Sequence, residues 1–149
     1  MTTEPRSLTE AERAALRAVM DRLVPPVDDL PGAGTMGLAA AVEAMALRFL
    51  LFHRALLCLL EEIAVDAFPA LAAPAQDATI VAFERAQPAV FAAVLDVVYL
   101  AYYGDARVHS RIGWRTGPLQ PRGFSLPPFD DAILEKARQR APFWRPAPE

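Results

Sequence analysis

The chain has little of what metal sites and covalent catalysis need. Its 149 residues include one cysteine and two histidines. A single cysteine cannot form an internal disulfide, and no Cys/His set has metal-ligand spacing. Cys58 lies in the apolar run LLCLLEEI, and no basic residue is obviously placed to lower its pKa. We therefore expect a small buried side chain there. Because no nucleophile–base pair or pair of catalytic carboxylates stands out, we assign no catalytic, cofactor-binding or metal-binding residue.

A phosphate-binding loop is also missing. The segment PGAG at residues 31–34 has the glycines, but the Gly-Lys-Ser/Thr that would end a Walker motif does not follow. Asp28 and Asp29 stand side by side just before it, and adjacent loop carboxylates are usually solvated rather than metal ligands. The chain is therefore expected to carry no redox cofactor of its own.

No apolar stretch is long enough to cross a bilayer, which needs about 20 residues with few charges. The most apolar run, residues 44–60, is interrupted by Arg48, His53 and Arg54. We read it as a core helix and expect no direct membrane insertion. The opening residues lack a basic segment followed by an apolar core, so they do not resemble a signal peptide. A cytoplasmic location is expected, or a periplasmic one only if the chain is exported together with a partner.

Positive charge is scarce overall and uneven along the chain. The net charge of −3 argues against nonspecific nucleic-acid binding, which needs a basic face. Residues 1–104 hold 7 basic and 13 acidic side chains, whereas residues 105–149 hold 8 and 5. Lys136 is the only lysine. Arginine favours planar, paired contacts at interfaces, so this C-terminal part either faces an acidic partner or reflects a general bias towards arginine.

The chain does have helical periodicity. Apolar residues make up 54 % of it, and no useful run alternates with period two, so an all-α fold is predicted. We expect an up-and-down bundle of about four helices joined by short loops. SLTE and TEAE are overlapping capping-box patterns that begin the first helix. The expected helices cover about residues 8–24, 35–67 with a bend or break, 77–86 and 88–103.

Polar residues within the second expected helix need partners. His53 sits among apolar residues and is expected to be a hydrogen-bonded core side chain. Arg48 and Arg54 must either reach an edge or pair with a carboxylate, for which the candidates are Glu43, Glu61 and Glu62.

The character of the chain changes at Gly104, a candidate helix C-cap. Glycines and prolines recur through residues 104–128, which are expected to be extended. A short last helix should follow, capped by Asp130 or Asp131 and reaching about residue 140, with Ile133 and Leu134 facing inward. The predicted organisation is one helical domain with a core at 1–103 and, at 104–149, an extended arm with this helix.

Several short motifs, in this order, resemble the gluconate 2-dehydrogenase subunit 3 family. The pieces that match are LTEAERAALRAVMDRLVPP at 8–26, AYYGD at 101–105, IGW at 112–114, PLQPRGF at 118–124 and the arginine-aromatic ending. The resemblance implies an all-helical, non-catalytic small subunit of a heteromeric complex. It would bind and stabilise a large FAD-dependent sugar or alcohol dehydrogenase of the glucose–methanol–choline type. FAD would then belong to the partner subunit.

Tyrosine, tryptophan, phenylalanine and arginine gather in the second half of the chain, which is the composition of interface anchors. The candidate partner-interface residues are Tyr99, Tyr102, Tyr103, Arg111, Trp114, Arg115, Phe143 and Trp144. Trp114 follows Gly113, where a small residue would let the backbone approach another surface closely. Two alternatives stay open. Tyr99, Tyr102 and Trp114 could instead complete the domain's own core, and a stand-alone ligand-binding protein or enzyme could use a pocket near Tyr103, His109 and Arg111.

Overall fold

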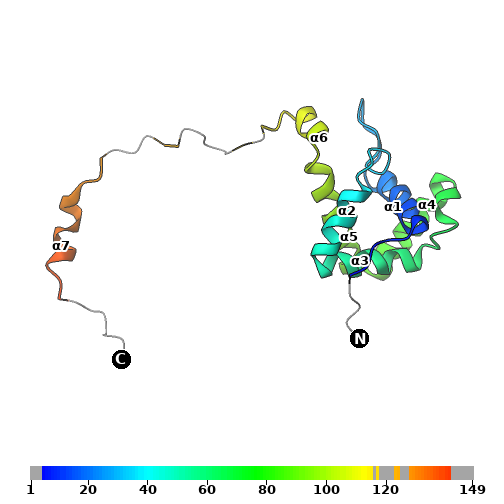
Figure 1. The fold of residues 1–149 in the computed structure, drawn as a ribbon, viewed down its shortest axis with the longest axis horizontal. Coiled ribbons are helices and arrows are strands. Elements are labelled where there is room, and N and C mark those ends of the chain that lie inside the picture. Colours follow the sequence, from blue (N-terminus) through cyan, green and yellow to red (C-terminus); the bar gives the residue numbers. More distant parts are fainter. Residues whose placement is uncertain (1–4, 116, 118–122, 125–127, 142–149) are drawn as a thin grey trace. The chain divides into compact units, whose positions relative to one another are not determined.

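The computed structural model describes residues 5–115, 117, 123–124 and 128–141. The chain divides into two units, residues 1–116 and residues 117–149. Throughout the described residues the regular structure is helical, which confirms the all-α class. Figure 1 traces both units.

Six α-helices and one short 3₁₀-helix make up the described part of the first unit. In chain order they are α1 (Glu10–Leu23), α2 (Ala39–Arg48), α3 (Leu50–Glu62), η1 (Phe68–Ala70), α4 (Ala73–Ala86), α5 (Pro88–Tyr103) and α6 (Ala106–Arg111). Helix α3 packs against both α2 and α5, and α1 packs against α2, α3 and α4. Figure 1 shows α1 to α5 gathered into one group.

The helix expected over residues 35–67, with a bend or break, is two helices in the structure. The backbone of Phe49 is extended, and it ends α2 and begins α3. Helix α3 stops at Glu62, where Ile63 caps it, and Ala64 then takes a positive φ of 51°. The chain turns there, and the fully buried ring of Phe68 anchors the next segment. The bend or break that the sequence allowed is therefore a break, and it lies at Phe49.

One apolar core joins these helices. Its largest fully buried side chains come from η1 and from α1, α2, α3, α5 and α6: Phe68, Leu16, Met20, Leu56, Leu59, Val19, Val42, Val94, Val97, Val98 and Val108. Val108 belongs to α6, within the region expected to be extended. That expectation is wrong for residues 106–111, which form a helix and contribute to the core.

Glycines let the loop after α1 lie close against that helix. A Cβ atom at Gly34 would stand 1.9 Å from the backbone oxygen of Arg17, a distance that no side chain could tolerate. The carboxylate of Asp21 holds the same loop by accepting hydrogen bonds from the backbone N–H and the hydroxyl of Thr35, both at 2.8 Å. The PGAG sequence thus has a packing role in the fold.

The second unit is described only in part. Residues 131–134 form a 3₁₀-helix, η2 (Asp131–Leu134), and α7 (Glu135–Arg138) follows it. Asp130 caps η2 through its side chain, as expected. Ile133 is 67 % exposed and Leu134 37 % exposed, so the prediction that both face inward is wrong. Four-residue helices bury little surface of their own.

A candidate partner-binding surface

The exposed end of α5 carries two neighbouring tyrosines. Tyr99 and Tyr103 lie one helical turn apart, and their ring centroids are 6.2 Å apart. Both side chains are more than 40 % exposed, as is Leu100 beside them. Tyr102 is half-buried and packs on the core, with its ring edge-to-face with Tyr103 at 5.3 Å. Tyr102 therefore belongs mainly to the core, whereas Tyr99 and Tyr103 point outward.

Helix α6 starts immediately after this end of α5. Gly104 ends α5 in a right-handed conformation, and the side chain of Asp105 then accepts the backbone N–H of Arg107 at 2.8 Å. The guanidinium group of Arg107 binds the same carboxylate and also donates to the backbone oxygen of Met36 at 3.0 Å. The Gly-Asp pair is therefore a helix stop followed at once by a helix start.

A glycine-dependent turn ends α6 and positions Trp114. The N–H of Trp114 donates to the carbonyl of His109 at 2.8 Å, and the N–H of Gly113 donates to that of Ser110 at 3.3 Å. Gly113 has a φ of 67°, so this is a Schellman ending with a left-handed glycine. The aromatic rings of His109 and Trp114 lie 6.4 Å apart across it.

Gly113 also has a role within the chain. A Cβ atom at this glycine would meet nothing within 4 Å in the described residues, so its own fold leaves the space beside it open. Its left-handed φ is the reason for a glycine there.

These two turns bring aromatic side chains together around a shallow pocket. The pocket encloses about 320 Å³ and is lined by Tyr103, His109, Ile112 and Trp114. Trp114 is 57 % exposed and Ile112 55 % exposed. We use the name aromatic surface for Tyr99, Tyr103, His109, Ile112 and Trp114. Trp114 does not complete the core, which removes that alternative for it and for the exposed Tyr99.

Arg111 does not line this pocket. Its guanidinium group pairs with Asp28 and, at 3.0 Å, with Asp29. Those two loop carboxylates therefore hold α6 rather than only facing solvent. Arg115 is exposed. Phe143 and Trp144 lie outside the described residues.

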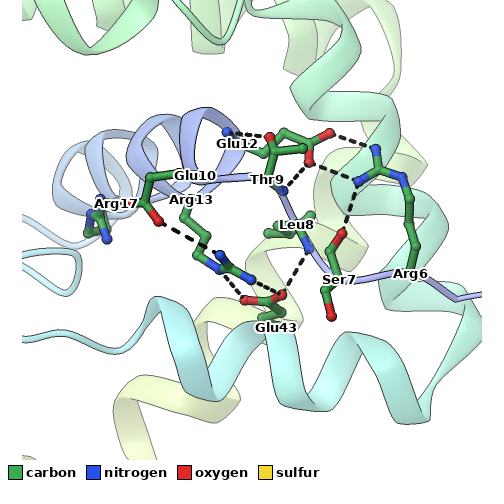
Figure 2. Close-up of polar contacts among 9 residues, drawn as sticks. All are labelled: Arg6, Ser7, Leu8, Thr9, Glu10, Glu12, Arg13, Arg17 and Glu43. Carbon is green, nitrogen blue, oxygen red and sulfur yellow. Dashed lines mark hydrogen bonds and ion pairs between the residues drawn. The ribbon is translucent and has the colours of Figure 1, made fainter.

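A second polar region surrounds the start of α1. The carboxylate of Glu12 accepts two hydrogen bonds from the guanidinium group of Arg6, at 2.9 and 2.6 Å, and one from the backbone N–H of Thr9 at 2.7 Å. The Thr9 hydroxyl accepts the N–H of Glu12 in return, so the predicted capping box is confirmed with Thr9 as the cap. Figure 2 shows the bonds from Arg6 and from the Thr9 N–H converging on the Glu12 carboxylate.

Glu43 joins α2 to the same region. Its carboxylate accepts hydrogen bonds from Arg13 at 2.8 and 3.0 Å and from the backbone N–H of Leu8 at 2.9 Å (Figure 2). We call Arg6, Thr9, Glu12, Arg13 and Glu43 the N-terminal clamp. Arginine binds the carboxylates of Glu12 and Glu43 in a two-pronged geometry, which makes these pairs stronger than single contacts.

The charged pairs shift carboxyl pKa values downward. Hydrogen bonding from Arg6 lowers the pKa of Glu12 to about 2, and Arg107 lowers the pKa of Asp105 to about 2 in the same way. The Arg13 guanidinium also lowers the pKa of Glu43. The bonds to Glu12 and Glu43 join separate segments, whereas the bond to Asp105 lies within the start of α6. All three carboxylates are therefore used in the hydrogen bonding of the fold itself.

The remaining polar candidates are engaged within the fold. His53 is buried, and its ring nitrogen lies 3.3 Å from the backbone N–H of Arg6, which confirms the prediction of a hydrogen-bonded core histidine. Cys58 is half-buried, not buried as expected, and its thiol donates to Gln87 at 3.2 Å.

Across the described ranges, no three His, Cys, Asp or Glu side chains lie close enough together to hold a metal ion. None of the helices described there is long and apolar enough to cross a membrane.

Comparison with known proteins gives no match to any family model, curated protein or solved structure.

Sequence reasoning could find some residues of the aromatic surface and of the contacts that position it, but not others. The tyrosines and Trp114 stood out by composition. Ile112 did not, because a lone isoleucine in a predicted loop has no period. The bond from Arg107 to the Met36 carbonyl joins residues that are 71 positions apart, so no local pattern could indicate it.

Proposed function

We propose that this chain is a non-catalytic binding subunit whose aromatic surface docks onto a larger protein. The observation that supports this most directly is the exposure of Tyr103, Ile112 and Trp114 around one preformed pocket. Tyrosine and tryptophan are enriched among residues that dominate binding energy at interfaces. Here they are fixed by a capped helix and a Schellman turn, so little conformational freedom is lost when a partner binds.

The proposed partner is a large FAD-dependent sugar or alcohol dehydrogenase of the glucose–methanol–choline type, in a cytoplasmic complex. This part of the proposal depends on the resemblance of the motifs. Two of the matching pieces, AYYGD and IGW, lie at the two ends of α6 and together carry much of the aromatic surface. Flavin and the catalytic groups belong to the partner in this scheme.

A second candidate is a stand-alone protein that binds a small ligand in the pocket beside Tyr103 and His109. The pocket has a volume of about 320 Å³, which falls within the range of small-molecule sites, near its lower limit. This volume favours the second candidate. Because Arg111 is turned to Asp28 and Asp29, the pocket lacks the cation expected for this role. We therefore prefer the binding subunit.

Co-expression tests the first proposal. The tagged chain is produced together with an FAD-dependent dehydrogenase of the glucose–methanol–choline type, and flavin absorbance is measured in the purified material. We expect a stoichiometric complex that Trp114→Ala weakens. Phe49→Ala is the matched control, because Phe49 is similarly exposed, at 52 %, but lies at the α2–α3 break.

A chain that purifies as a soluble monomer, leaves the flavoprotein behind and binds a small ligand in a Trp114-dependent way would replace this proposal with the second one. Flavin bound by the isolated chain would contradict its non-catalytic role.

A further inference from the structure

A groove separate from the aromatic surface runs between α3 and α5. It encloses about 330 Å³ and is lined by Leu51, Arg54, Ala55, Cys58, Ala89, Val90 and Ala93. Ala55 and Ala93 are buried and form its floor, while Leu51 is 67 % exposed at its edge. Small side chains on both helices leave this space open where larger ones would fill it. The groove is therefore part of the helix packing itself.

The chemistry of the lining is almost entirely apolar. The thiol of Cys58 already donates its hydrogen to the side-chain oxygen of Gln87 at 3.2 Å, so it presents a satisfied, weakly polar surface. The lining residues on α3, from Leu51 to Cys58, span about 10 Å at 1.5 Å per residue. The groove thus suits a narrow hydrocarbon ligand, and its volume is within the lower range of small-molecule sites.

Arg54 is the one charged residue of the lining, and its side chain is exposed. Most other arginines of the first unit form ion pairs, such as Arg13 with Glu43 and Arg22 with Asp77. Arg54 forms none with any residue that the structure describes, although Glu43, Glu61 and Glu62 were the expected partners. Reaching an edge was the other expected outcome, and Arg54 does so at this groove.

We propose that the α3–α5 groove binds a single-chain anionic amphiphile of the fatty-acid class. Its hydrocarbon chain lies along the floor formed by Ala55 and Ala93, and its carboxylate pairs with the guanidinium group of Arg54. A neutral hydrocarbon would leave that cation unused, and a hydrophilic anion would leave the apolar floor exposed. An amphiphilic carboxylate matches both features, and arginine binds carboxylates in a two-pronged geometry.

Isothermal titration calorimetry with decanoate, below its micelle concentration, tests the proposal on the purified full chain. We expect one decanoate per chain. Arg54→Gln should weaken binding roughly tenfold, because a charge-assisted hydrogen bond is lost. Arg54→Lys should restore part of the affinity. Decanol should bind the original chain and Arg54→Gln equally.

Filling the groove provides the second arm. Ala89 is exposed and lines the groove, so Ala89→Leu should occupy it without disturbing the core and should abolish decanoate binding. Ala92→Leu is the matched control, because Ala92 is exposed on the same helix and does not line the groove. Trp114→Ala should leave decanoate binding unchanged, which separates this site from the aromatic surface.

Three results would overturn the proposal. One is the absence of saturable decanoate binding. Another is equal binding by the original chain, Arg54→Gln and Ala89→Leu. The third is binding only to anionic phospholipid vesicles and not to dissolved decanoate, which would assign this face to a lipid surface instead.

Discussion

The N-terminal clamp and the aromatic surface differ in whether their side chains find partners within the chain. In the clamp, the carboxylates of Glu12 and Glu43 receive hydrogen bonds from arginines and backbone N–H groups of the same chain. On the aromatic surface, Tyr103 and Trp114 keep more than half of their area exposed. The clamp satisfies its own polar groups, whereas the aromatic surface leaves apolar area uncovered.

This difference separates stability from recognition. The LTEAER piece of the resemblance contributes Thr9, Glu12 and Arg13 to the clamp, so the fold itself explains that piece. Tyr103 and Trp114 contribute little to the folding stability of the isolated chain, because apolar area that stays exposed does not contribute to folding. Variants in the two regions should therefore change different measurements.

Glu43→Ala should have the largest effect, and it should fall on stability. It removes the acceptor of the Leu8 N–H and the nearest carboxylate of Arg13, at a cost of about 2–3 kcal/mol. A chain of this size should lose on the order of 10 °C in Tm by differential scanning calorimetry. Partner affinity at low temperature should not change. Glu10→Ala is the control, since this carboxylate is 76 % exposed and its pairs should contribute under about 1 kcal/mol.

Trp114→Ala should show the reverse pattern. Interface tryptophans typically contribute about 2 kcal/mol or more, so a titration should show a roughly thirtyfold loss of affinity for the proposed flavoprotein partner. The Tm of the free chain should change little because the side chain is 57 % exposed. A large drop in Tm with unchanged affinity would show that Trp114 stabilises the fold and does not anchor the complex.

Gly113→Ala should lower both the stability of the free chain and its affinity for the partner, each by less than the two variants above. A non-glycine residue at a φ of 67° costs about 1 kcal/mol, and relief of the strain would move Trp114. We expect a slightly lower Tm and a several-fold weaker complex. Gly113→Asn should recover part of both, since asparagine tolerates the left-handed region better. Equal affinities for the alanine variant and the original chain would show that the Schellman turn does not position the anchor.

The smallest effect concerns pH. The pKa of Glu12 is about 2 in the folded chain and ordinarily about 4.5. A lowered folded pKa stabilises the fold above the ordinary value, and this contribution disappears as the pH falls from 4.5 towards 2. Solvent screening limits it to about 1 kcal/mol. Glu12→Gln keeps a capping-box residue and should flatten the fall in Tm over this range. An unchanged pH profile would mean that the Arg6–Glu12 pair does not stabilise the fold.

Local signals in the sequence predicted the elements that local forces build. The Thr9 capping box and the helix at Pro88–Tyr103 were predicted because their caps and apolar spacing lie within the elements themselves. Helix α6 was missed because it has only six residues between two glycines and depends on distant partners for its position. Asp28, Asp29 and the Met36 carbonyl supply those partners.

For the aromatic surface too, the sequence predicted what depends on residue type and missed what depends on packing. Composition pointed to Tyr99, Tyr103 and Trp114, but it could not separate them from the half-buried Tyr102, since burial is set by the rest of the core. Nor could it show that Arg111 is used within the fold.

Hydrogen exchange with mass spectrometry tests the central claim most directly, because it reads both regions in one experiment. Exchange is compared between the free chain and its complex with the proposed flavoprotein partner, in peptides covering residues 6–17 and residues 99–115. The account predicts added protection at 99–115 on complex formation and little change at 6–17, where the clamp already holds the backbone. Unchanged exchange at 99–115 in a complex that has formed would contradict it.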